Sequence, residues 1–127
     1  MERKLRILLA DDDPMNRKMA AMCLSRLGYT ADMVSNGAEA VEAVEQNSYD
    51  LVLMDVEMPR LNGIEATQEI SRRFGKNKPV IVALTASASH GDKEMLLSKG
   101  LQGYLTKPIV MDDLSSLLEK WKNELDD

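Results

Sequence analysis

The segment from Leu5 to Pro14, with the sequence LRILLADDDP, decides the fold class of this chain. It joins the apolar run Leu5–Ala10 to three aspartates and a proline. A short, almost continuous apolar run is typical of a strand that is covered on both faces. The change to Asp11, Asp12 and Asp13 predicts that the strand ends there and that carboxylates lie beyond its carboxyl end.

The same unit, an apolar run followed by an amphipathic stretch, recurs along the chain. Strict alternation of strands and helices predicts a parallel sheet with right-handed crossovers. Five units predict an α/β, flavodoxin-like doubly wound fold, (βα)5, with a five-stranded parallel sheet in the order 2-1-3-4-5. In that order a crevice lies beyond the carboxyl ends of the first and third strands. The other four expected strands are Tyr29–Val34, Tyr49–Met54, Pro79–Thr85 and Gly103–Thr106.

Helical spacing follows each apolar run. In the first helix the spacing predicts a core-facing stripe, which includes Cys23 as a small buried residue. The fourth helix is expected at Asp92–Lys99, because Gly100 is a typical stop. The expected stripe of the first helix is Met15, Met19, Met22, Cys23 and Leu27, and that of the last helix is Leu114, Leu117, Leu118, Trp121 and Leu125.

Length and composition predict a single domain over residues 1–127. The formal net charge is −5, which disfavours direct nucleic-acid binding because phosphates would be repelled. One cysteine allows no intrachain disulfide, and no apolar run approaches the roughly 20 residues of a membrane span. Because no signal peptide opens the chain, a cytoplasmic domain is expected that does not itself enter a membrane.

Polar and ionisable residues follow four of the five apolar runs. Asp11 and Asp12 follow the first run, Asp55 the third, and Lys107 the fifth, while Thr85 ends the fourth. In a parallel sheet these strand ends share one edge, so the five side chains are expected to converge on one crevice.

Three converging carboxylates, Asp11, Asp12 and Asp55, would repel one another. At ~5 Å and an effective dielectric constant near ~20, each pair costs on the order of 3 kcal/mol. An all-oxygen cluster of this kind suits a hard divalent cation, Mg²⁺ or Mn²⁺ in its place. Lys107 adds a positive charge that can pair with Asp55. An aspartate can itself be the nucleophile of phosphoryl transfer, which requires mainly positioning and stabilisation of oxygen charge.

With these residues in view, the chain resembles response-regulator receiver domains of the chemotaxis-regulator type over essentially its whole length. Single pairs such as Thr85-Ala86 are weak signals, but the ordered set is specific. The Met-Pro pair at 58–59 and the acidic opening are most similar to receivers of hybrid sensor histidine kinases or phosphorelay proteins. The segments that carry the resemblance are 7–17 (ILLADDDPMNR), 53–59 (LMDVEMP), 84–86 (LTA) and 107–109 (KPI).

The resemblance implies a role for each matching residue. Asp55 would be the phosphoacceptor, and Asp12 the main carboxylate ligand of Mg²⁺. Asp11 would bind the metal partly through water, and Glu57 would contribute its backbone carbonyl. Thr85 and Lys107 would contact the phosphoryl oxygens.

The same resemblance implies a switch and a donor. Thr85 would move inward on phosphorylation and Tyr104 would turn in, which would remodel the face formed by the fourth helix, fifth strand and fifth helix. Pro108 would follow a cis peptide bond. The phosphoryl donor would be a phosphohistidine of a histidine kinase or histidine phosphotransfer domain, and the receiver would be a monomer or weak dimer rather than a stand-alone enzyme.

Several further residues lie near the expected site. Asp13 stands where the subgroup often has Asn, and Val110 stands where a helix-capping residue is frequent. Ser87 occupies a position that can tune access of water to the phosphoryl group, and equally suits a solvated loop. His90 is expected to be exposed rather than a phosphodonor. Pro59 and Gly63 are expected to shape the loop after Asp55, with Gly63 in a backbone conformation that a Cβ disfavours.

Two other classes of protein remain as alternatives. Asp11-x-Asp13 after a strand also resembles haloacid-dehalogenase-type phosphatases, with Asp11 as nucleophile. In that family a later acidic pair closes a strand, whereas Asp112-Asp113 are expected to begin a helix. A binding module, either a flavodoxin or a phosphorylation-silent pseudo-receiver, is the second. Three carboxylates would repel the phosphate of a flavin nucleotide, and a silent receiver usually lacks one of the site residues. The aspartate that becomes acylated discriminates between the classes.

Overall fold

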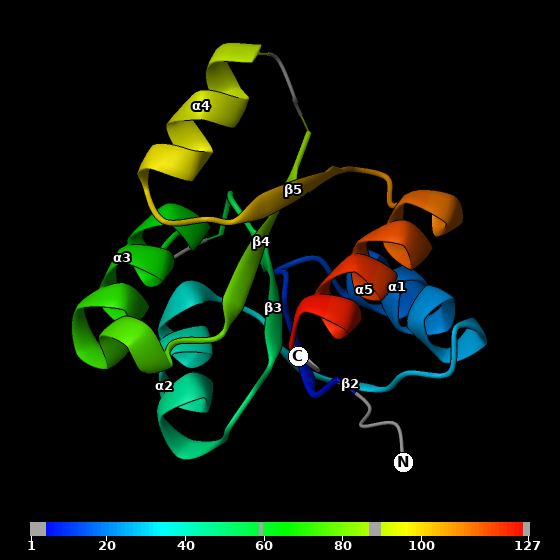
Figure 1. Ribbon diagram of the computed structural model, residues 1–127, viewed down its shortest axis with the longest axis horizontal. Coiled ribbons are helices and arrows are strands. Elements are labelled where there is room, and N and C mark those ends of the chain that lie inside the picture. The colour runs from blue at the N-terminus through cyan, green and yellow to red at the C-terminus, as the bar shows by residue number, and fades with distance from the viewer. Residues whose placement is uncertain (1–4, 59, 87–89, 126–127) are drawn as a thin grey trace.

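The computed structural model describes residues 5–58, 60–86 and 90–125. Strands and helices alternate, and the parallel sheet has the order β2-β1-β3-β4-β5, which confirms the predicted flavodoxin-like fold (Figure 1). The strands are β1 (Ile7–Ala10), β2 (Ala31–Val34), β3 (Leu51–Asp55), β4 (Val80–Thr85) and β5 (Gly103–Thr106). The helices are α1 (Pro14–Arg26), α2 (Gly37–Gln46), α3 (Gly63–Phe74), the 3-10 helix η1 (Gly75–Asn77), α4 (His90–Ser98) and α5 (Met111–Leu125).

Helices cover both faces of the sheet. Figure 1 shows α2, α3 and α4 on one side and α1 and α5 on the other. Side chains of β1, β3 and β4 alternate between two apolar layers: Leu8 packs toward the α2–α3–α4 side, and Ile7 and Leu9 toward α1 and α5. Burial on both faces explains why these strands read as continuous apolar runs. Residues of β2 are more exposed, as expected at the edge of the sheet.

Three helices begin with a side-chain cap close to the carboxyl edge of the sheet. Asp13 caps α1, Asn36 caps α2, and Asn62 caps α3 in a capping box with Glu65. Each cap oxygen accepts a backbone N–H that the helix leaves without an internal partner. The caps therefore define the turns that lead from the strand ends into the helices.

The predicted core face of α1 is wrong in part. Met15, Met19 and Met22 are 63%, 50% and 51% exposed, whereas the fully buried residues of α1 are Ala20 and Leu24. Cys23 is half-buried and, with Leu27, packs against that core. Apolar residues occupy more than one face of this helix, so two stripes fit a helical period, and spacing alone did not identify the one that faces β1.

The element boundaries differ slightly from those expected. The β2 strand begins at Ala31 rather than Tyr29, α4 begins at His90 rather than Asp92, and β5 has the predicted bounds. Val110, which is 51% exposed, precedes α5, and its side chain has no polar atom that could cap the helix. Pro59 and Ser87 lie outside the described residues. Of the helices in the described ranges, none is long and apolar enough to cross a membrane.

Gly63 is needed for a different reason from the one predicted. Its φ is not positive; instead, a Cβ at this position would lie 2.1 Å from the backbone oxygen of Asp55. The first turn of α3 therefore packs directly on the end of β3. Space, rather than backbone conformation, requires glycine here.

Candidate functional site

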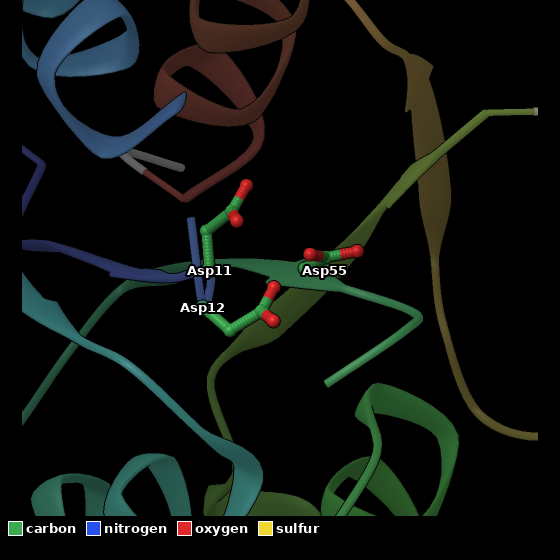
Figure 2. A group of neighbouring side chains, drawn as sticks. All are labelled: Asp11, Asp12 and Asp55. Atoms are coloured by element: carbon green, nitrogen blue, oxygen red, sulfur yellow. The ribbon is translucent and has the colours of Figure 1, made fainter. Parts of the chain in front are cut away.

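The acidic residues predicted at the strand ends lie together. Asp11 and Asp12 follow β1 and Asp55 is the last residue of β3; these strands are neighbours. One carboxylate oxygen from each residue lies within 4.8 Å of the others. Figure 2 shows the Asp55 carboxylate beside those of Asp11 and Asp12. The short distances between like charges mean that the site favours a cation.

Lys107 supplies a positive charge to the same cluster. It follows β5, and its Nζ lies 2.8 Å from Oδ2 of Asp55 and 3.6 Å from Oδ2 of Asp11. Its backbone N–H donates to the backbone oxygen of Thr85, the last residue of β4, at 2.8 Å. Burial would lower the pKa of Lys107, but the two neighbouring carboxylates outweigh it and raise the pKa above its usual value. The side chain is therefore a cation at neutral pH.

Asp55 is almost completely buried, but it also lines the cleft. Its residue is 2% exposed, yet it contributes to the lining of an open cleft. Burial raises the pKa of its carboxyl, and the ion pair with Lys107 and the N–H of Glu57, 3.1 Å from Oδ1, oppose this only in part. The carboxylate is held by two donors and has an approach from solvent, as a nucleophile requires.

The turn after β1 has a hydrogen-bond network that spacing did not predict. The N–H of Asp13 donates to Oδ1 of Asp11 at 2.9 Å, and the N–H of Met15 donates to Oδ1 of Asp13 at 2.8 Å. Nη1 of Arg17 donates to the backbone oxygen of Asp11 at 2.7 Å. Arg17 belongs to the motif at 7–17, but its sequence position gives no signal for this contact with the end of β1.

The donor set of the cleft fits a hard divalent cation. The cleft is lined by oxygen-bearing residues, including exposed Asp12 and the segment that contains Glu57. Among the described residues, no histidine or cysteine belongs to the acidic cluster. Carboxylate and carbonyl oxygens are the ligands that Mg²⁺ takes, and open space leaves room for its waters. Asp11, Asp12 and Asp55 are thus the candidate ligands, and the resemblance to receiver domains adds the backbone carbonyl of Glu57, which lines the same cleft.

The remaining predicted residues lie around this edge of the sheet. The peptide bond between Lys107 and Pro108 is cis. Thr85 is half-buried at the end of β4. Tyr104 on β5 is half-buried, packs against the core below α4, and has Nζ of Lys93 5.6 Å from its ring centroid. His90 begins α4, and its side chain lies outside the described structure.

An apolar pocket adjoins the acidic cleft. It lies between α1 and the segment after β5, and Asn16 and Lys107 line both the pocket and the cleft. Its apolar lining is Met19, Ala20, Cys23, Leu84, Pro108 and Ile109. The exposed methionines Met15 and Met22 lie on the same helix.

Comparison with known proteins gives the family. The family model described as "Response regulator receiver domain" matches residues 7–119. The chain is 42% identical over 123 residues to Sensor protein GacS of Pseudomonas syringae, and the match covers 94% of this chain and 14% of that protein. The chain thus spans a small part of the length of the curated relative.

Two solved structures are informative about the site. The receiver domain of a sensor histidine kinase from Pseudomonas aeruginosa is 37% identical, with a TM-score of 0.84 over 95% of this chain and 99% of that one, and it has a magnesium ion coordinated in its active-site cleft. A second receiver domain is 32% identical, with a TM-score of 0.85 over 96% of this chain and 91% of that one. It is the receiver domain of a response regulator, and it was solved in complex with the Saccharomyces cerevisiae histidine phosphotransfer protein that acts upstream of it.

These matches and the convergence of the acidic residues with Lys107 leave no basis for the dehalogenase or flavodoxin alternatives. The chain belongs to the response regulator receiver domain family.

Proposed function

We propose that residues 1–127 form one receiver domain that accepts a phosphoryl group on Asp55 from a phosphohistidine of a histidine kinase or histidine phosphotransfer domain. The observation that carries the proposal is the ion pair of Asp55 with Lys107 beside the carboxylates of Asp11 and Asp12. In the transfer, a carboxylate oxygen of Asp55 bonds to phosphorus as the P–N bond of the donor breaks. The electron pair of that bond returns to the ring nitrogen, and the imidazole leaves neutral because its other ring nitrogen carries a proton.

The residues of the chain have separate tasks in this reaction. Asp11, Asp12, Asp55 and the carbonyl of Glu57 would hold Mg²⁺. The bound ion would supply positive charge that offsets the repulsion between carboxylates and phosphoryl oxygens. Lys107 would neutralise a further phosphoryl oxygen, and the Thr85 hydroxyl would donate to another, because charge on these oxygens is what the site must stabilise.

The response to phosphorylation would be a shift between two conformations. The phosphoryl group offers Thr85 a new acceptor, so the conformation in which Thr85 lies inward gains a contact. We propose that Tyr104 then turns inward and that the surface of α4, β5 and α5 changes for protein–protein signalling. We also propose that the chain acts in the cytoplasm, where a free thiol such as that of Cys23 stays reduced.

The exposed methionines of α1 support a protein donor. Met15, Met19 and Met22 present a flexible apolar surface beside the apolar pocket and the cleft. Methionine adapts well to partner surfaces. A helix that carries the donor histidine could pack on this surface and direct its phosphoryl group toward Asp55.

The test is transfer from a phosphorylated histidine phosphotransfer domain that carries a labelled phosphoryl group. The label should move to the wild-type chain in the presence of Mg²⁺, should be absent from Asp55→Asn, and should stay on the donor when EDTA is added. Label on Asp11 instead of Asp55, or transfer that is unaffected by Asp55→Asn, would contradict the proposal.

A further inference from the structure

The backbone oxygen of Asp11 lies where the sheet ends. The last residue of β1 is Ala10, and the N–H of Asp11 still donates to Val34 of β2 at 3.1 Å. The carbonyl of Asp11 accepts instead from Nη1 of Arg17, at the end of the first turn of α1, at 2.7 Å. The guanidinium thus takes the place of a neighbouring strand at the point where the chain leaves the sheet.

The same turn carries two of the three clustered carboxylates. Oδ1 of Asp11 accepts the N–H of Asp13, and its Oδ2 lies 3.6 Å from Lys107. Asp12 is exposed and, within the described part of the chain, no hydrogen bond holds its carboxylate. Its position therefore depends on the backbone of the turn rather than on its own contacts.

We propose that Arg17 is a positioning residue of the phosphorylation site. By holding the Asp11 carbonyl, it sets the turn that presents the carboxylates of Asp11 and Asp12 to the divalent cation. The inference rests on the proposed function and adds to it a residue that touches neither the cation nor the phosphoryl group. A hydrogen bond from a charged donor is stronger than a neutral one, which suits Arg17 to this task.

Electrostatics and positioning predict opposite effects of removing Arg17. A guanidinium near a cation site repels the cation, so loss of its charge alone would tighten Mg²⁺ binding. Loss of the contact with Asp11 would loosen the turn and weaken binding. The direction of the change in the Kd of Mg²⁺ therefore separates the two effects.

The experiment compares Arg17→Met with Arg26→Met. Both changes remove a guanidinium from α1 and keep a good helix former, and Arg26 is exposed in the last turn. By calorimetric titration, Arg17→Met should raise the Kd of Mg²⁺ about tenfold, the factor that the loss of one hydrogen bond to a charged group supplies. Arg26→Met should leave the Kd within about twofold, since it touches no group of the turn. Arg17→Lys, which keeps a charged donor, should lie between wild type and Arg17→Met.

A second measurement needs no metal. In metal-free protein, the amide of Asp13 should exchange with solvent about tenfold faster in Arg17→Met than in wild type, because its acceptor Asp11 is less firmly held. An unchanged or lower Kd, or an unchanged exchange rate, would overturn the role of Arg17. Failure of the wild type to bind Mg²⁺ would instead contradict the proposed function, and the exchange rate would still decide the role of Arg17.

Discussion

The ion pair of Asp55 and Lys107 shows which contacts of the site can be predicted from the sequence. Both residues follow apolar runs that sequence periodicity identifies as strands, so their convergence could be predicted from topology alone. Their 2.8 Å contact also requires the path of the chain between Thr85 and Lys107. The contact of Arg17 with Asp11 could not be predicted, because a helix turn and a strand end meet there in a geometry that no sequence period encodes.

Asp55 should make the metal-free fold more stable in acid. Because burial raises its pKa, the folded state favours the protonated carboxyl. This stability is fully present below the ordinary aspartate pKa of about 4 and is lost as the pH rises through the raised pKa of the folded state. Thermal unfolding without metal should therefore give Asp55→Asn a higher Tm than wild type at pH 7, with a gap that closes below about pH 4. Equal Tm values at pH 7 would contradict this account.

Asp13 should affect Mg²⁺ binding through its negative charge and not through its role as the N-cap of α1. It caps α1 through Oδ1 and lines the cleft, and asparagine caps helices equally well. In Asp13→Asn, calorimetry at low salt should show a Kd for Mg²⁺ raised about fivefold, because a charge roughly 8 Å from a divalent ion contributes on the order of 1 kcal/mol in water. The Tm should stay close to that of wild type.

The control for this change is Glu124→Gln, which removes the same charge from an exposed position on α5. It should leave the Kd unchanged. If both variants weaken Mg²⁺ binding equally, net charge rather than the place of Asp13 accounts for the effect.

The helices and strands differ in how well their patterns predict them. Apolar runs predicted all five strands. The signal is clearest for β1, β3 and β4, which are buried on both faces, and β5 has the expected bounds. The predicted inner face of α1 is wrong in part, because Met15, Met19 and Met22 have helical spacing although they are exposed, whereas Cys23 and Leu27 do pack against the core. Helix spacing predicts that a helix forms, but the face that is buried depends on the neighbouring elements.

The junction of β3 and α3 requires a residue without a side chain at position 63. In Gly63→Ala the new Cβ would meet the Asp55 carbonyl at 2.1 Å, so the first turn of α3 must move. Urea unfolding should show a loss of about 3 kcal/mol, at the upper end of overpacking effects. Because the displaced carbonyl belongs to Asp55, the rate of phosphorylation should fall as well.

The matched control is Gly103→Ala on β5, where the nearest atom to the new Cβ would be 3.8 Å away. This is ordinary van der Waals contact, and the loss should be below about 1 kcal/mol. A loss in Gly63→Ala no greater than that in Gly103→Ala would show that α3 accommodates the side chain.

At the scale of the whole molecule, two different surfaces lie next to each other: the cleft that contains Asp55 and the exposed methionines of α1. The cleft with Asp55 lies at the carboxyl edge of the sheet, and the methionine surface of α1 adjoins it. A small phosphodonor needs only the cleft, whereas a protein donor also needs a surface on which to pack. The two kinds of donor should therefore respond differently to changes on α1.

The double variant Met15→Gln/Met22→Gln tests this separation. It should slow transfer from a phosphorylated histidine phosphotransfer domain about tenfold, the effect of losing contacts at the centre of an interface. Phosphorylation by acetyl phosphate should be unchanged. Met33→Gln, at a methionine on β2 that is 47% exposed, is the control and should affect neither reaction. Equal slowing with both donors would mean that the change acts on the site itself.

The central claim is that a single carboxylate, that of Asp55, carries the phosphoryl group. Mass spectrometry of the intact chain and of its peptides, after incubation with Mg²⁺ and acetyl phosphate, tests this most directly. The account predicts one added phosphoryl group located on Asp55, none in Asp55→Asn, and none when EDTA is present. A phosphoryl group on Asp11, or an unmodified wild-type chain under conditions in which it binds Mg²⁺, would contradict it.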